Sequence, residues 1–104
     1  MVTAIEDNID KIISLCRKMQ LQSLYLFGSS IDEKKYSKNS DLDFLYKFKK
    51  DENGLPVSQY DYFDLMFSLE EITGKKIDLV AEEKMKNKFF ISRVNSEKIK
   101  IYEL

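Results

Sequence analysis

Apolar and polar residues follow helical spacing in some parts of the chain and strand spacing in others. Between Ile5 and Met19 the apolar positions recur at helical spacing, which predicts a helix over about residues 4–19. Glu6 follows Thr3 in the position that the second partner of a capping box takes. We therefore expect Thr3 to be the N-cap of this helix.

Shorter apolar runs predict the strands of a small sheet. A run over residues 21–27 ends at Gly28, as a strand entering a turn does. Residues 41–49 and 76–81 alternate between apolar and polar positions, which is typical of half-buried strands. The same alternation from residue 99 onward predicts a short final strand.

Two further helices are predicted between these strands. Residues 58–73 have an apolar helical face, with Ser58 as the candidate cap and Gly74 as the C-terminal stop. Residues 83–95 have a second apolar face that includes Phe89. These segments also contain aromatic area that a partner protein could contact, although we expect most of it to lie in the core. The residues are Tyr60, Tyr62, Phe63, Phe67, Phe89 and Phe90.

The order of the elements indicates the fold class. Strands alternate with helices or polar segments along the chain, which predicts an α/β or α+β fold with a small mixed β-sheet. We expect the helices to pack on one face of the sheet and to leave the other face open for chemistry. A length of 104 residues fits one domain, so residues 1–104 are predicted to form a single unit.

The strand predicted over residues 41–49 separates apolar side chains from carboxylates. Because successive side chains of a strand point to opposite faces, Asp41 and Asp43 leave the same face. Asp78, on the strand predicted over 76–81, joins them if the two strands are neighbours. The apolar face consists of Leu42, Phe44, Tyr46 and Phe48, and the other of Asp41, Asp43, Leu45 and Lys47.

Carboxylates aimed at one point favour a bound cation. Neighbouring carboxylates repel one another unless a positive ion lies between them, and oxygen ligands select Mg²⁺ or Mn²⁺. Magnesium commonly combines one or two protein carboxylates with substrate phosphates. The sequence therefore predicts that Asp41, Asp43 and Asp78 hold one or two Mg²⁺ ions, with Mn²⁺ as the alternative.

Gly28, Ser29 and Ser30 follow the strand predicted over residues 21–27 and suit a phosphate-binding turn. A glycine lets the backbone approach a phosphate closely, and N–H groups at a following helical turn bind anions. The serine hydroxyl adds a hydrogen-bond donor. We expect this turn to position a nucleotide triphosphate.

Composition and charge narrow the class of protein. Charged residues make up 34% and hydrophobic residues 43% of the chain, as in an ordinary globular protein. The formal charge of −1 lacks the excess of basic residues that is typical of nucleic-acid-binding proteins. No apolar run approaches the length of a membrane helix. With a single cysteine, Cys16, no internal disulfide is possible. We expect a cytoplasmic protein without a membrane or nucleic-acid partner.

The absence of histidine excludes several kinds of catalysis. A chain with no histidine has no Ser-His-Asp or Cys-His arrangement and no histidine-ligated zinc, and one cysteine cannot form a thiolate zinc site. Catalysis must then use carboxylates, hydroxyls, amines or a hard metal ion.

Three motifs together resemble the nucleotidyltransferase signature of the DNA polymerase beta superfamily. The chain has Phe27-Gly28-Ser29, then Asp41-Leu42-Asp43, then Lys76-Ile77-Asp78-Leu79-Val80. The short length resembles the minimal nucleotidyltransferases, which include the MntA-type antitoxins encoded beside HEPN-domain toxins. The resemblance extends over most of the chain, from the first predicted strand to the last.

The resemblance implies a reaction and a role for each matched residue. It implies transfer of a nucleoside monophosphate from an NTP to a hydroxyl, with Gly28 and Ser29 on the triphosphate. Asp41 and Asp43 would bind metal, and Asp78 would bind metal or accept the proton of the hydroxyl. For antitoxin members the acceptor is a tyrosine of the HEPN toxin and the donor is ATP, which implies a hetero-oligomer with the toxin.

The segment after Ser29 departs from the common pattern of the family. Many members have an arginine and a further glycine soon after Gly-Ser, whereas this chain continues Ser30-Ile31-Asp32-Glu33-Lys34-Lys35. Lys34 or Lys35 could serve the phosphates instead, although lysines in a polar segment are more often simply solvated. The departure bears on the rate of catalysis and not on the fold.

Three functions therefore compete on the sequence. The first is an adenylyltransferase that modifies a HEPN-type toxin and so acts as its antitoxin. The second is a non-catalytic binding module with a vestigial nucleotide site, which the presence of all three carboxylates disfavours. The third is a free-standing nucleotidyltransferase for a small molecule or RNA, which the near-neutral charge disfavours.

Overall fold

The computed structural model describes residues 2–28 and 41–104. No helix within these two ranges combines the length and the apolar character that a membrane crossing requires. The elements are α1 (Thr3–Glu6), α2 (Ile9–Lys18), β1 (Leu21–Phe27), β2 (Leu42–Phe48), α3 (Tyr62–Thr73), β3 (Ile77–Ala81), the 3₁₀ turn η2 (Glu82–Lys84), α4 (Lys88–Glu97) and β4 (Ile99–Glu103).

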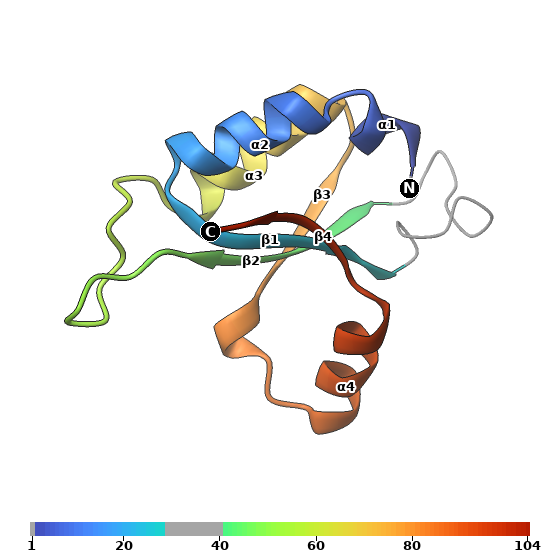
Figure 1. The fold of residues 1–104 in the computed structure, drawn as a ribbon. Helices are drawn as coiled ribbons and strands as arrows, with labels where there is room; N and C mark the ends of the chain where they lie inside the picture. Colours follow the sequence, from blue (N-terminus) through green and yellow to red (C-terminus); the bar gives the residue numbers. More distant parts are fainter. Residues whose placement is uncertain (1, 29–40) are drawn as a thin grey trace.

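The four strands form one mixed sheet in the order β3-β2-β1-β4. β1 pairs antiparallel with both β2 and β4, whereas β2 and β3 are parallel. The parallel pair is joined through α3, which crosses over the sheet as such connections must (Figure 1). The predicted small mixed sheet with helices is confirmed.

The main core lies between the sheet and the helices α1, α2 and α3, which cover the same face (Figure 1). Leu24 and Phe44 project from the sheet into this core, and Ile12 and Leu69 meet them from the helices. All four side chains are fully buried. The apolar alternation of β2 therefore points toward the helices, as predicted.

One correction concerns the opposite face of the sheet, which we expected to be free of helices. α4 lies on that side (Figure 1), and its Val94 forms a second buried cluster with Phe27 and Leu45. Leu45 shares a face with Asp43, and an apolar side chain there gains free energy only when it is covered. α4 therefore covers the middle of this face.

The N-terminal helix is also interrupted, where we expected it to be continuous. The Asn8 side-chain amide donates to the Ala4 carbonyl at 2.8 Å, and the Asn8 backbone N–H bonds to Ile5 instead. A side chain that takes a helical acceptor competes with the helix backbone, which ends α1 before α2 begins. The N-cap of α1 is Val2 and makes no side-chain hydrogen bond, so the prediction of Thr3 was wrong.

The start of α3 differs from the prediction as well. Asp61 is the N-cap and forms a capping box with Asp64, with N···O distances of 3.0 and 2.9 Å. The Ser58 hydroxyl instead accepts from the backbone N–H of Tyr60. Two carboxylates satisfy the free N–H groups at a helix start better than one hydroxyl. The helix does end at Gly74, whose φ is 70°.

The helix predicted over residues 83–95 is two elements. After η2 the chain is extended at Met85, and α4 begins when the Asn87 side chain accepts the N–H groups of Phe89 and Phe90. Because asparagine is a preferred N-cap, it starts a new helix here instead of continuing an old one.

Candidate functional site: two aspartates and a glycine at the sheet edge

The parallel pairing of β2 and β3 brings two of the predicted carboxylates together. Asp43 and Asp78 are direct partners in the register, between the pairs Leu42–Ile77 and Phe44–Leu79. Partners in a parallel ladder have side chains on the same face. From the sequence, Asp78 was expected to join Asp43 only if the two strands were neighbours, and β2 and β3 are neighbours in the sheet.

The electrostatics of Asp43 reflect this crowding. Burial, followed by the negative charges of Asp78 and Asp41, raises the pKa of Asp43 to about 6, and a hydrogen bond with Asp78 contributes further. A carboxylate whose charged form is disfavoured by neighbouring carboxylates gains from a cation placed among them. The donor set therefore fits a hard divalent ion.

Gly28 lies against Asp43 at the end of β1. Its φ of +67° is a left-handed conformation that glycine adopts without strain. A Cβ atom at this position would stand 2.6 Å from Asp43 Oδ2, closer than any side chain tolerates. Phe27, one residue earlier, is the antiparallel partner of Asp43. The glycine is therefore required by both its backbone conformation and its proximity to the carboxylate.

Asp41 is the least constrained of the three acids. It is exposed and lies just before β2, near enough to Asp43 to affect its pKa. Within residues 2–28 and 41–104, no three side chains of the histidine, cysteine, aspartate and glutamate types gather as a metal-ligand set. The structure thus pairs Asp43 with Asp78, and a role for Asp41 as a ligand stays a prediction.

The other residues predicted to bind the nucleotide follow Gly28 in the chain. Ser29 and Ser30 lie outside the described residues, as do Lys34 and Lys35. Gly28 is the last described residue of the motif, and it lies beside Asp43.

The apolar support of the site was not predicted from the sequence. Phe27 packs edge-on against Phe90 of α4 with ring centroids 6.1 Å apart, in the cluster that contains Leu45 and Val94. Phe27 is the cross-strand partner of Asp43, and Leu45 follows Asp43 by two positions on the same face of β2, so the cluster adjoins Asp43 along both strands. The signal in the sequence was Leu45, an apolar residue on the same strand face as Asp43 and Lys47, which indicates that another element covers this face.

The family model for the polymerase beta nucleotidyltransferases matches residues 10–104. The chain belongs to this family. The match includes all three aspartates and Gly28, so the Asp43–Asp78 pair lies within a nucleotidyltransferase domain.

One similar protein has a name that specifies the kind of nucleotidyl transfer. A protein of Methanocaldococcus jannaschii named "Putative protein adenylyltransferase" is 32% identical over 82 residues, which cover 79% of this chain and 78% of the relative.

Two solved structures share the fold. A chain of a toxin–antitoxin complex with AMP-PNP matches with a TM-score of 0.65 and 24% identity over 93% of this chain and 74% of that one. A chain from the complex of a tri-AMPylated Shewanella oneidensis HEPN toxin with an MNT antitoxin matches with a TM-score of 0.59 and 22% identity, over 95% and 72% of the two chains.

Proposed function

We propose that this nucleotidyltransferase transfers AMP from ATP to a hydroxyl, in particular a tyrosine hydroxyl, of a HEPN-type toxin and thereby acts as its antitoxin. The observation that supports this most directly is the Asp43–Asp78 pair beside Gly28, inside a family domain whose relatives include an adenylyltransferase. The AMP-PNP complex and the AMPylated toxin among the similar structures agree with the donor and the acceptor.

In the proposed reaction, each residue of the site has a role that follows from its chemistry. Gly28 lets the triphosphate approach the backbone, and Ser29 and Ser30 are predicted to donate hydrogen bonds to it. Asp43 and Asp78, with Asp41, would hold Mg²⁺, which neutralises charge on the phosphates when it is bound. Alternatively, Asp78, which is exposed on the edge strand β3, would accept the proton of the incoming hydroxyl.

The bond changes balance without any further reagent. The acceptor oxygen forms a bond to the α-phosphorus of ATP while the bond from that phosphorus to the bridging oxygen breaks. Pyrophosphate leaves with the bonding electrons, and the hydroxyl proton passes to a carboxylate or to water. Positioning and charge stabilisation therefore supply most of the acceleration.

The test is first to identify a HEPN-domain protein among the products of the neighbouring genes, and then to measure its intact mass after incubation with this chain, ATP and Mg²⁺. We expect a gain of one or more AMP units, and a loss of rate of roughly 100- to 1,000-fold in Asp43→Asn and in the double variant Asp41→Asn/Asp43→Asn. The matched control is Asp10→Asn, which changes an exposed aspartate on α2.

The two alternative functions predict different results. A non-catalytic binding module forms a stable complex with the HEPN protein and adds no mass, and Asp43→Asn still neutralises it. An enzyme for small molecules or RNA neither binds nor modifies the HEPN protein. Either result would refute the proposal.

A further inference from the structure

Two phenylalanines that we expected in the core lie on the surface of α3. Phe63 is 58% exposed and Phe67 is 61% exposed. Their rings are stacked, with centroids 6.4 Å apart and an interplanar angle of 29°. Single exposed apolar residues are common, but stacked aromatic rings that share a surface indicate a site of interaction.

Ring contacts continue from these phenylalanines to the sheet. Tyr62 lies 5.1 Å from Phe63 and 6.0 Å from Tyr46, and Tyr46 lies 5.7 Å from Phe48 on β2. We call the five residues Phe48, Tyr46, Tyr62, Phe63 and Phe67 the aromatic strip. The strip joins the exposed side of α3 to the far end of β2.

A pocket with lysines on its rim lies at the β2 end of the aromatic strip. Tyr46 and Phe48 contribute to its wall together with Pro56, and its volume is about 130 Å³. Sites for drug-sized ligands are usually at least about 300 Å³. The pocket therefore suits one side chain of a larger partner and not a whole nucleotide.

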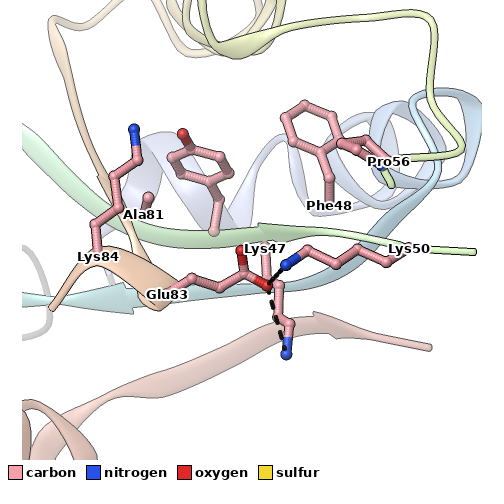
Figure 2. Close-up of a pocket in the computed structure, with 8 residues that line it drawn as sticks. Lys47, Phe48, Lys50, Pro56, Ala81, Glu83 and Lys84 are labelled. Atoms are coloured by element: carbon pink, nitrogen blue, oxygen red, sulfur yellow. Dashed lines mark ion pairs between the residues drawn. The ribbon is translucent and has the colours of Figure 1, made fainter. Parts of the chain in front are cut away.

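The chemistry of the pocket favours a carboxylate. Figure 2 shows Glu83 directed toward Lys50, whose Nζ lies 2.6 Å from Glu83 Oε1, with Lys47 at 4.0 Å from the same oxygen. Lys84 extends away from Glu83 in Figure 2 and has no ion pair with a described residue. Three lysines and one glutamate line the pocket, so the lining has a net positive charge.

We propose that the aromatic strip and this pocket form the docking surface for the acceptor protein. The segment that docks would place apolar side chains on Phe63 and Phe67 and an acidic side chain in the pocket, where it pairs with Lys84 or displaces Glu83. This inference rests on the proposed function, because it identifies the surface that holds the protein to be modified.

The location of the surface suits such a role. β3 is an edge strand, and α3 packs beside it. The pair Tyr46–Ala81 in the pocket wall lies on the same two strands as Asp43–Asp78, three register positions further along. At about 3.3 Å per residue the two pairs are separated by about 10 Å. Because three positions is an odd number, the side chains of the two pairs leave opposite faces of the sheet. A protein docked here therefore presents its hydroxyl to the carboxylates by reaching around the edge strand β3.

The charges around the aromatic strip favour a protein over RNA. Stacked aromatic rings beside lysines can also bind single-stranded RNA. However, the capping carboxylates Asp61 and Asp64 are exposed at the start of α3, next to Phe63, and Glu83 lies in the pocket. These negative charges repel a phosphate backbone but tolerate a mixed protein surface.

The experiment measures the steady-state kinetics of AMP transfer to the HEPN protein, and its binding by calorimetry, for three variants. Phe63→Ala/Phe67→Ala removes the exposed rings, and Lys84→Glu reverses the charge of Lys84 at the pocket. The control, Phe89→Ala, removes a ring that is 88% exposed on α4, across the sheet from α3. Because all these side chains are exposed, the variants are expected to keep the thermal midpoint of the wild type.

We expect the phenylalanine double variant to raise both the KM and the Kd for the HEPN protein at least about 30-fold, which is the effect of losing a binding hot spot. Lys84→Glu is expected to raise them about 5- to 10-fold, by an amount that decreases in high salt. The KM for ATP stays unchanged in both variants, and Phe89→Ala behaves as the wild type.

Other results separate the two proposals. Wild-type kinetics in the phenylalanine double variant would overturn the docking surface and leave the adenylyltransferase function intact. Absence of transfer by the wild type would overturn the function, and the docking surface with it. Binding of a single-stranded RNA oligonucleotide that Phe63→Ala/Phe67→Ala abolishes, without any effect on the HEPN protein, would assign the surface to RNA instead.

Discussion

Asp43→Asn is expected to stabilise the ligand-free protein while it slows AMP transfer roughly 100- to 1,000-fold. Burial and the carboxylates of Asp78 and Asp41 raise the pKa of Asp43 from 3.8 to about 6. At about 1.4 kcal/mol for each pH unit, this rise corresponds to about 3 kcal/mol of unfavourable free energy for the charged form. Since the carboxylate is only half-buried, solvent screening reduces the expected effect to roughly 1–1.5 kcal/mol.

The direction of the pH dependence follows from the raised pKa. Between about pH 4 and pH 6 the folded protein holds a proton on Asp43 that the unfolded chain has released, so the contribution of this group to stability falls as the pH rises. Below pH 4, Asp43 is protonated in both the folded and the unfolded state, so the unfavourable free energy of its charged form is absent. Above pH 6 the full cost is present, and asparagine removes it.

The assay is urea unfolding of the wild type and Asp43→Asn at pH 4, 6 and 8 without divalent ions. We expect the variant to be more stable by about 1 kcal/mol at pH 8, which is roughly 4–8 °C in the thermal midpoint, and nearly equal at pH 4. Added Mg²⁺ should stabilise the wild type more than the variant, because it binds the folded carboxylates.

Asp10→Asn serves as the control, because it makes the same substitution at an exposed aspartate on α2, outside the Asp43–Asp78 pair. Equal or lower stability of Asp43→Asn at pH 8, or a gain that persists unchanged at pH 4, would show that repulsion at the Asp43–Asp78 pair does not strain the fold.

Three further predictions concern single positions. Gly28→Ala should lower the free energy of unfolding by about 1–3 kcal/mol and AMP transfer by more than about 10-fold, because the new Cβ would meet Asp43 and the left-handed backbone disfavours alanine; wild-type stability by urea unfolding would contradict this. Asp61→Ala should cost about 0.5–2 kcal/mol through loss of the capping box, whereas Ser58→Ala should cost less, which the same assay would compare. Leu69→Ala should lower the free energy of unfolding by about 2–5 kcal/mol, because the Leu69 side chain on α3 is fully buried in the main core. A loss below about 1 kcal/mol in urea unfolding would place Leu69 outside the core.

Local patterns in the sequence were sufficient to locate the parts of the site. The period of two along residues 41–49 assigned Asp41 and Asp43 to one face and the core residues to the other, because the pleat of a strand permits no other arrangement. Gly28 and Gly74 marked the ends of β1 and α3 correctly, since each adopts a left-handed conformation that other residues avoid. These properties depend on neighbours along the chain.

Contacts between distant segments required the three-dimensional arrangement. That Asp78 pairs with Asp43, and not with another residue of the sheet, depends on the strand order and register of β2 and β3, which no local pattern encodes. The cover of Leu45 by α4 and the exposure of Phe63 and Phe67 likewise depend on where each helix docks. A helical apolar face can be read from spacing, but the part of a wide face that is buried is set by the shape of the sheet beneath it, and the aromatic rings left over form a surface for a partner.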